Sequence, residues 1–263
     1  MAIEVYGSAS ATPRLAGRAV VDLARAAAGR LIDLVLPPRC VSCGLPVTDA
    51  GLCGTCWAQV DFISAPYCER LGTPFPYDPG EALVSPAALA EPPVYGRARA
   101  VARYEGPARA LVRALKFQDR LDLAGTLASL MTRAGQSLLA DCNVVVPIPL
   151  HRRRLFGRRF NQSAVLAERI AGLACRDYAP SAIRRIKPTR HQVGLSATER
   201  RRNVAGAFKV ASENRPLLEG RHVLLVDDVL TTGATADACA RACLRARATS
   251  VDVLVFARVA APV

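Results

Sequence analysis

The sequence predicts an α/β protein built on a doubly wound parallel sheet, preceded by a small cysteine-rich module. Two observations support this prediction. Short apolar runs alternate with stretches of helical periodicity through the C-terminal part of the chain. Two Cys-x-x-Cys pairs lie close together near the N-terminus, in a stretch too short to build an apolar core of its own.

The elements of the predicted sheet follow from the apolar pattern and from helix-start signals. Strands are expected at residues 94–104, 144–148, 223–226 and 251–255. Helices are expected from Pro107 to about Met131, from Asn161 to Cys175, and from about Gly233 to Arg247. Asn161 is expected to be an N-cap, because its side-chain oxygen can accept a hydrogen bond from a free backbone N–H of the first turn.

The chain divides into three predicted parts. Residues 1–36 form a tail and a helix that ends before Pro37 and Pro38. Residues 37–92 hold the cysteine module and a proline-rich linker, which we expect to be irregular from Leu71 to Pro93. Residues 93–263 form the large domain.

Composition and charge indicate a globular protein that binds a polyanion. Hydrophobic residues make up 51% and charged residues 22% of the chain, and the formal net charge is +13. Residues 151–202 alone carry 14 Lys and Arg against 3 acidic residues. Such a segment suits pyrophosphate, a phosphorylated sugar or a nucleic-acid backbone. The alternative is a solvated arginine-rich face.

The N-terminal region predicts neither secretion nor a membrane span. Residues 1–12 lack the basic start and apolar run of a secretory leader. The apolar stretch at residues 15–36 carries five charged residues, too many for a bilayer-spanning helix. We therefore expect a cytoplasmic protein, whose reducing surroundings favour metal binding over disulfides for paired cysteines.

The two cysteine pairs predict a structural zinc site with four thiolate ligands: Cys40, Cys43, Cys53 and Cys56. All four positions of a tetrahedron would be filled by protein, which leaves none open for catalysis. The alternative is a pair of redox or chance motifs. Cys68 is either a replacement ligand or a spare thiol. The four remaining cysteines are expected in the core: Cys142, Cys175, Cys239 and Cys243.

The segment after the third predicted strand indicates a site for a phosphorylated ribose. Asp227 and Asp228 follow the apolar run and can accept hydrogen bonds from two vicinal ribose hydroxyls. A small, hydroxyl-rich turn comes next and opens a helix: Thr231, Thr232, Gly233, Ala234 and Thr235. Its backbone N–H groups, together with the positive end of the helix, can hold a phosphate. The alternative is an ordinary strand–turn–helix with an acidic cap.

These residues resemble a known family. The segment "VLLVDDVLTTGAT" is similar to the phosphoribosyl-pyrophosphate motif of type I phosphoribosyltransferases. The cysteine pairs narrow the resemblance to the ComF (ComFC/GntX-like) family, as do "LVRALKF" at 111–117, "VVVPIPLHRRRLFGRRFNQS" at 144–163 and "RHQVGLSATERRRNVAGAF" at 190–208. The chain departs from the family pattern at Leu71, where members tend to have the second cysteine of a further pair, and at Arg159, where they usually have glycine.

The resemblance implies a type I phosphoribosyltransferase fold with an N-terminal zinc ribbon. It implies that Asp227 and Asp228 hold the ribose hydroxyls with Mg²⁺ nearby, and that residues 231–235 hold the 5′-phosphate. It places pyrophosphate at the loop that carries three arginines: Arg152, Arg153 and Arg154. Lys116 belongs to a family motif, and the alternative for it is an ordinary helix-surface lysine.

Three functions compete at this point. The first is a phosphoribosyltransferase that uses phosphoribosyl pyrophosphate and Mg²⁺ and acts on an unidentified nucleophile. The second is a non-catalytic binder of nucleotide and single-stranded DNA, of the kind linked to DNA uptake in competence. The third is a sensor that reads phosphoribosyl pyrophosphate and signals through the zinc module. The sequence identifies neither the acceptor nor the oligomeric state.

Overall fold

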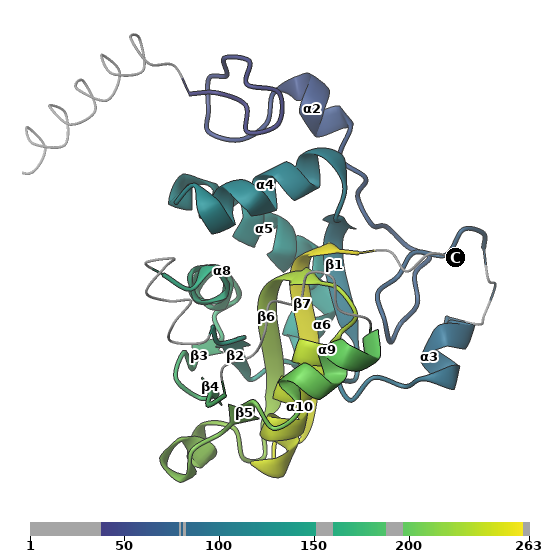
Figure 1. Ribbon diagram of the computed structural model, residues 1–263, viewed down its shortest axis with the longest axis vertical. Coiled ribbons are helices and arrows are strands. Elements are labelled where there is room, and N and C mark those ends of the chain that lie inside the picture. The colour runs from purple at the N-terminus through teal and green to yellow at the C-terminus, as the bar shows by residue number, and fades with distance from the viewer. Residues whose placement is uncertain (1–37, 79, 81–82, 151–159, 188–196, 260–263) are drawn as a thin grey trace, which may run out of the picture.

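The centre of the molecule is a five-stranded sheet in which all neighbouring strands run parallel. The computed structural model describes residues 38–78, 80, 83–150, 160–187 and 197–259. The strands are β1 (Ala98–Arg103), β2 (Val144–Pro147), β3 (Asp177–Tyr178), β6 (His222–Leu230) and β7 (Ser250–Arg258). Their order is β1-β7-β6-β2-β3, which puts β6 in the middle (Figure 1).

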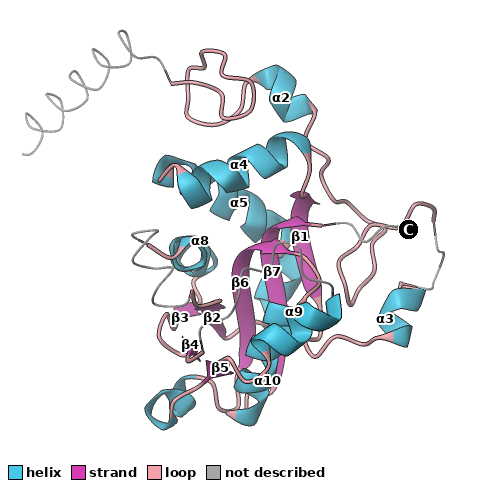
Figure 2. Cartoon of the chain, in the orientation of Figure 1, coloured by secondary structure: helices cyan, strands magenta, loops and turns pink. Residues whose placement is uncertain are grey.

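Helices cover both faces of this sheet, as the alternation of strands and helices predicts (Figure 2). One face packs against α4 (Gly106–Phe117), α5 (Ala124–Ala134), α6 (Gln136–Asp141) and α8 (Gln162–Ala174). The other face packs against α10 (Ala234–Arg245). The doubly wound parallel sheet is therefore confirmed.

The strand β6 shows how one apolar run serves two cores. Val223 and Leu225 belong to the core beneath α10, whereas Leu224 and Val226 belong to the core beneath α4, α5 and α8. Successive side chains of a strand point to opposite faces, so a strand buried on both sides is apolar at every position. This explains the unbroken run that the sequence shows before the aspartates.

A second, smaller sheet lies against α10. It consists of the antiparallel strands β4 (Arg184–Arg185) and β5 (Phe208–Lys209). Between them in the chain comes α9 (Ala197–Val204), and a 3₁₀ segment, η2 (Ser212–Leu217), follows β5. Phe208 and Val204 are buried in the core beneath α10, which fixes this substructure to the sheet.

The cysteine-rich part of the chain lies beside β1 and α4. It contains two short helices, α2 (Gly54–Ala58) and α3 (Pro86–Ala90), which Figure 1 shows at opposite ends of this region. The connecting segment runs antiparallel to β1, where the Ile63 N–H donates to the Val101 carbonyl at 2.9 Å. This segment therefore covers the outer edge of the sheet.

Several boundaries differ from those that the pattern predicts. The strand expected to end at Val226 continues to Leu230, because β7 supplies a parallel partner along the whole length of β6. The helix expected from Pro107 to Met131 is interrupted after Phe117, where Asp119 takes a left-handed backbone conformation (φ +52°). The linker expected to be irregular contains α3.

The N-cap at Asn161 is confirmed, since its Oδ1 accepts a hydrogen bond from the Ser163 N–H at 3.2 Å. Cys142, Cys239 and Cys243 are buried, as predicted. The prediction for Cys175 is wrong: it is exposed at the C-terminal end of α8, in a left-handed conformation. Among the residues that the structure describes, no helix combines the length and the apolar character that a bilayer crossing requires.

Candidate functional site

Strand β6, a short turn and α10 form the candidate site at the carboxyl end of the sheet. Asp227 and Asp228 lie inside β6 rather than after it. The turn at residues 231–233 then leads directly into α10. Ligands of open parallel sheets bind at this end, because loops from neighbouring strands converge there.

Asp228 forms an ion pair with Lys116. Asp228 Oδ1 lies 2.8 Å from Lys116 Nζ, and only 8% and 19% of the two side chains are exposed. Asp228 is two residues after Val226 in the strand and so faces α4, whose last turn carries Lys116. Burial lowers the pKa of Lys116, but attraction to Asp228 more than offsets it, and the pKa lies above its ordinary value. The alternative of a surface lysine is therefore wrong.

Asp227 accepts two hydrogen bonds on one oxygen. Ser163 Oγ donates to Asp227 Oδ1 at 2.7 Å, and the Asp228 N–H donates to the same atom at 2.9 Å. Burial, together with the negative charge of Asp228, raises the pKa of Asp227 to about 7, although Lys116 and Ser163 oppose the rise. Asp227 therefore changes its protonation near neutral pH.

The second oxygen of each carboxylate remains open to a ligand. Among the residues that the structure describes, no donor bonds Oδ2 of Asp227 or Oδ2 of Asp228. The pair therefore retains acceptor atoms of the kind that ribose hydroxyls need, even though Lys116 and Ser163 occupy the first oxygens.

The turn after β6 presents free backbone donors. Within the described part of the chain, the N–H groups of Thr231, Thr232, Gly233 and Ala234 have no hydrogen-bond acceptor. Gly233 has φ +80°, which a residue with a side chain rarely adopts, and an added Cβ would lie 3.4 Å from the Tyr95 hydroxyl oxygen. With the positive end of α10 behind them, these donors form an anion-binding turn.

One cavity of about 310 Å³ brings the two halves of the site together. The following residues line it: Tyr104, Lys116, Ile148, Pro149, Leu150, Ser163, Arg185, Asp227, Asp228, Val229, Leu230, Thr231, Gly233, Thr235 and Ala236. Of the turn residues singled out by the sequence, Thr232 is exposed and Ala234 is buried at the start of α10. The acid pair and the anion-binding turn thus share one space.

The three arginines of the predicted pyrophosphate loop lie outside the described residues. Arg152, Arg153 and Arg154 belong to the segment 151–159. Pro149 and Leu150, which come directly before it, line the cavity. The chain therefore enters this segment from the wall of the cavity.

Sequence reasoning missed Ser163 and Arg185 as residues of the site. Ser163 lies in the first turn of α8, the helix that follows β2, and this position at a strand's carboxyl end is a signal that could have found it. Arg185 reaches the cavity from β4, and its guanidinium lies 5.2 Å from the centre of the Phe208 ring. No local pattern places β4 at the cavity, because it arrives through tertiary packing.

The four predicted zinc ligands lie together. One side-chain sulfur from each of Cys40, Cys43, Cys53 and Cys56 lies within 4.8 Å of the others. Two close contacts hold the cluster: Cys43 Sγ lies 3.6 Å from Cys53 Sγ, and the Cys56 N–H donates to Cys53 Sγ at 3.5 Å. Four convergent sulfurs form the donor set of a structural zinc site.

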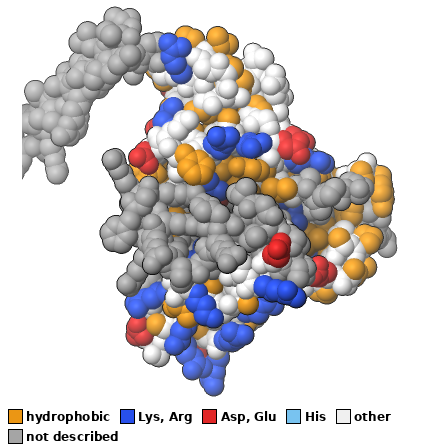
Figure 3. All heavy atoms as spheres, in the orientation of Figure 1, with side chains coloured by type: hydrophobic (Ala, Val, Ile, Leu, Met, Phe, Trp, Pro, Cys, Tyr) orange, Lys and Arg blue, Asp and Glu red, His pale blue; other side chains and the backbone are white. Residues whose placement is uncertain are grey.

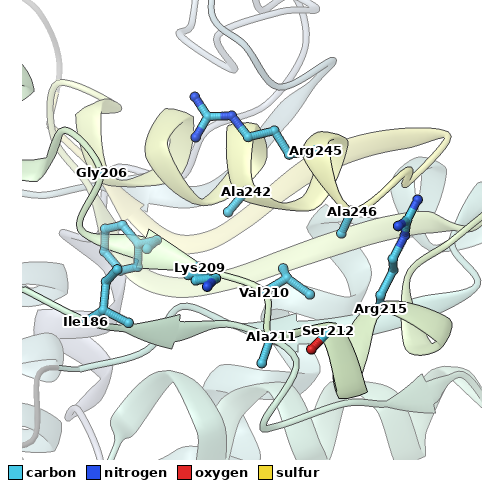
Figure 4. A pocket seen from close by; sticks show the side chains of 11 residues that line it. Ile186, Gly206, Lys209, Val210, Ala211, Ser212, Arg215, Ala242, Arg245 and Ala246 are labelled. Carbon is cyan, nitrogen blue, oxygen red and sulfur yellow. The ribbon is translucent and has the colours of Figure 1, made fainter.

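A basic groove extends along α10, away from the acid pair. One cavity of about 520 Å³ and another of about 370 Å³ line up between α10 and the small sheet. Figure 4 shows Ala242 and Ala246 of α10 pointing toward the chain from Lys209 onward, whereas the side chain of Arg245, which also lines the cavity, extends away from that segment. Lys and Arg side chains gather over this part of the surface in Figure 3.

Most cations of this groove pair with no acidic residue in the described part of the chain. The groove is lined by Arg202, Lys209, Arg215, Arg241 and Arg245. Arg215 pairs with Glu219 at 3.5 Å, and no described acidic residue pairs with the other four. The groove reaches Ala234, the first residue of α10, so it begins where the anion-binding turn ends.

Comparisons with known proteins identify families that match the two parts of this chain. Residues 31–88 match the model of the family described as "Double zinc ribbon domain", and residues 167–262 match "Phosphoribosyl transferase domain". The second match contains β6, the anion-binding turn and α10.

Whole proteins match as well. The chain is 32% identical over 236 residues to "DNA utilization protein YhgH" of Escherichia coli O157:H7, covering 86% of this chain and 99% of that protein. It is 32% identical over 207 residues to "Competence protein F" of Haemophilus influenzae, covering 75% of this chain and 86% of that protein. The chain belongs to the ComF/YhgH family. "Competence protein ComFC" of Bacillus subtilis, a further similar protein, is 27% identical over 61% of this chain.

Membership of the ComF/YhgH family agrees with the architecture. The ComF/YhgH chain has a phosphoribosyltransferase domain with a five-stranded parallel sheet, and an N-terminal zinc ribbon with a cluster of four cysteines. The fold and the family that the sequence motifs indicate are therefore confirmed.

Proposed function

We propose that this ComF/YhgH chain binds a ribose bearing a 5′-phosphate, as phosphoribosyl pyrophosphate or a nucleotide, in the cavity at the end of β6. The observation that carries the proposal is the sharing of one cavity by two kinds of group. The carboxylates of Asp227 and Asp228 line this cavity together with the turn whose backbone N–H groups have no acceptor among the described residues. A phosphorylated sugar needs acceptors for its hydroxyls and donors for its phosphate, so both kinds of group have a partner on one ligand.

In this proposal the ribose hydroxyls donate to the second oxygens of Asp227 and Asp228. Lys116 and Ser163 hold the first oxygens and so orient both carboxylates before the ligand arrives. The 5′-phosphate accepts from the N–H groups of residues 231–234 at the start of α10. Arg185, which also lines the cavity, adds positive charge to it.

We extend the proposal to catalysis with Mg²⁺, as the family resemblance implies. The carboxylate oxygens are donors of the kind that Mg²⁺ prefers, and a bound Mg²⁺ would neutralise charge on the pyrophosphate. The bond between C1 of the ribose and pyrophosphate breaks, and an unidentified nucleophile forms a new bond to C1. The acid pair fixes the ribose during this exchange, and the resemblance assigns the departing pyrophosphate to Arg152, Arg153 and Arg154.

For the four-cysteine cluster we propose a structural Zn²⁺. The ligand set contains only protein sulfurs, so it offers no open position for a substrate. A reducing cytoplasm would keep these thiols available to the metal. We place the end of the ribbon region near Pro92 and the large domain at residues 93–263.

The proposal is tested by calorimetric titration of the full chain with phosphoribosyl pyrophosphate, ribose 5-phosphate and ribose, each with Mg²⁺. Binding of the two phosphorylated compounds without detectable binding of ribose supports it. Failure of both phosphorylated compounds to bind, or binding of ribose as tight as that of ribose 5-phosphate, contradicts it. Release of pyrophosphate in the presence of a panel of bases then tests the catalytic extension.

The basic groove favours a second candidate, binding of single-stranded DNA. Four cations that pair with no acidic residue in the described part of the chain line the groove, two of them on α10, and the matched relatives are named for DNA utilization and competence. A nucleic-acid backbone laid along such a groove releases counterions, so its affinity falls steeply with salt. Fluorescence anisotropy with a labelled oligonucleotide at several salt concentrations tests this. Affinity that does not change with salt contradicts it.

A further inference from the structure

The loop at Cys68 has the same backbone as the zinc knuckle at Cys40. In the knuckle, the Cys40 N–H donates to the Leu45 carbonyl at 2.8 Å, and the Gly44 N–H donates to the Cys40 carbonyl at 2.9 Å. Gly44 has φ +76°. A β-bridge joins the flanking residues, Arg39 and Pro46.

Each of these features recurs 28 positions later in the chain. The Cys68 N–H donates to the Thr73 carbonyl at 2.8 Å, and the Gly72 N–H donates to the Cys68 carbonyl at 2.7 Å. Gly72 has φ +65°, and a β-bridge joins Tyr67 to Pro74. The fold of a zinc knuckle is therefore present at Cys68, with Leu71 in the position that Cys43 occupies in the first.

The second half of the ribbon recurs as well. In the first ribbon, Cys53 is the N-cap of α2, a helix of 5 residues, and its sulfur accepts from the Cys56 N–H. In the second, Ser85 is the N-cap of α3, also 5 residues long, and its Oγ accepts from the Ala88 N–H at 3.4 Å. Ser85 and Ala88 thus stand where Cys53 and Cys56 stand.

We propose that residues 67–90 are a second zinc ribbon that folds without metal. Three of its four ligand positions cannot bind zinc well: Leu71 and Ala88 offer no donor atom, and Ser85 offers a hydroxyl. The family model matched here is named for two ribbons, whereas only the first has a full set of ligands. This inference concerns the metal content of the chain and does not depend on the proposed ligand of the β6 cavity.

Hydrogen bonds around Cys68 replace the metal. Its sulfur is fully buried and lies 3.3 Å from both the backbone nitrogen and Oγ of Ser85. The Leu71 N–H donates to the same sulfur at 3.5 Å. The first and third ligand positions are therefore joined directly, where a zinc ion would otherwise join them.

Packing against the large domain supplies further stabilisation. Arg99 of β1 donates to the Glu69 carbonyl at 2.9 Å and forms an ion pair with the Glu69 carboxylate. Arg70 donates to the Pro93 carbonyl at 3.1 Å. A Cβ added at Gly72 would lie 2.5 Å from the Ala98 carbonyl oxygen, so the knuckle backbone rests directly on β1. These contacts can hold the second ribbon in place of a metal.

The proposal is tested by the zinc content of the purified full-length chain, measured by inductively coupled plasma mass spectrometry. One zinc per chain is expected in the unmodified protein, and Cys68→Ala is expected to retain it. Two zinc ions per chain in the unmodified protein, or the loss of one in Cys68→Ala, would overturn the proposal.

A gain of metal tests the ribbon geometry. The triple variant Leu71→Cys, Ser85→Cys, Ala88→Cys completes a four-cysteine set with Cys68 and is expected to hold two zinc ions per chain. The control Leu71→Ser, Ala88→Ser changes the same loop without adding sulfur and is expected to hold one. A folded triple variant that still holds one zinc would show that residues 67–90 lack the ribbon geometry.

Discussion

The β6 cavity and the basic groove along α10 can both bind an anion, but their charged groups differ in burial. The cavity holds the buried carboxylate of Asp228, the partly buried carboxylate of Asp227, a lysine with 19% of its side chain exposed, and backbone N–H groups that have no acceptor among the described residues. The groove holds exposed arginines and a lysine on the surface of a helix and a small sheet. The cavity charges are fixed by packing, whereas the groove charges are solvated.

This difference in burial suits the cavity to specific recognition of a ligand and the groove to non-specific attraction of negative charge. Burying charged groups is costly unless they are paired, so the cavity lowers the stability of the fold in exchange for fixed geometry. Solvated cations cost little, but they recognise only charge and not shape. Changes in the cavity should therefore alter stability and ligand choice together, whereas changes in the groove should alter only salt-dependent binding.

The largest effect on stability is expected from Lys116→Met. The substitution keeps most of the apolar stem but leaves Asp228 as a buried carboxylate without its cation. We expect the free energy of unfolding to fall by about 3 kcal/mol. Urea unfolding at neutral pH measures it, with Arg120→Gln, which breaks the exposed pair with Asp122, as the control. A loss no larger than that of the control would show that the Lys116–Asp228 pair is not needed for stability.

A somewhat smaller, pH-dependent effect is expected from Asp227→Asn. Because the folded-state pKa of about 7 exceeds the ordinary value, the folded protein holds a proton that the unfolded chain releases. Stability of the unmodified protein should therefore fall as pH rises from about 4 through 7, and asparagine removes that loss.

We expect the stability advantage of Asp227→Asn over the unmodified chain to grow by about 2 kcal/mol between pH 5 and pH 8. Urea unfolding at the two pH values measures it, and Asp177→Asn, an exposed carboxylate paired with Arg221, controls for the loss of a charge. An advantage that stays constant or shrinks would mean that Asp227 is ionised at both pH values.

The smallest effect on stability is expected in the groove. The double variant Arg241→Gln, Arg245→Gln should change the free energy of unfolding by less than about 0.5 kcal/mol, because both side chains are exposed. If DNA lies in the groove, the same variant should weaken oligonucleotide binding. It should also reduce the slope of log affinity against log salt concentration by the amount expected for the loss of about two phosphate contacts. Arg109→Gln, Arg113→Gln on the exposed side of α4 is the matched control, and an equal loss there would place DNA elsewhere.

The sequence predicted those parts of the site that depend on neighbours in the chain. The apolar strand, the turn with Gly233 and the helix after it are local, and so are the cysteine pairs and the Asn161 cap. Each rests on a short pattern whose physical cause lies within a few residues.

The parts that sequence reasoning missed depend on tertiary contacts. Alternation in β6 places Asp228 on the face of α4, but no pattern shows that Lys116 reaches it. The extension of β6 to Leu230 depends on pairing with β7, although the two aspartates interrupt the apolar run. Sequence reasoning identified the loss of a further cysteine pair at Leu71, but it did not predict that Gly72 and the Ser85 cap preserve the ribbon fold there, because the lost cysteines were its sequence signal.

The most direct test of the central claim is a calorimetric titration of phosphoribosyl pyrophosphate with Mg²⁺ into the unmodified chain and into Asp228→Asn. Asp177→Asn serves as the charge control, and circular dichroism verifies that each variant is folded. Loss of a hydrogen bond to a charged group predicts binding weakened roughly 100-fold in Asp228→Asn and unchanged in Asp177→Asn. Equal affinity of the unmodified chain and a folded Asp228→Asn would contradict the assignment of the ribose to this acid pair.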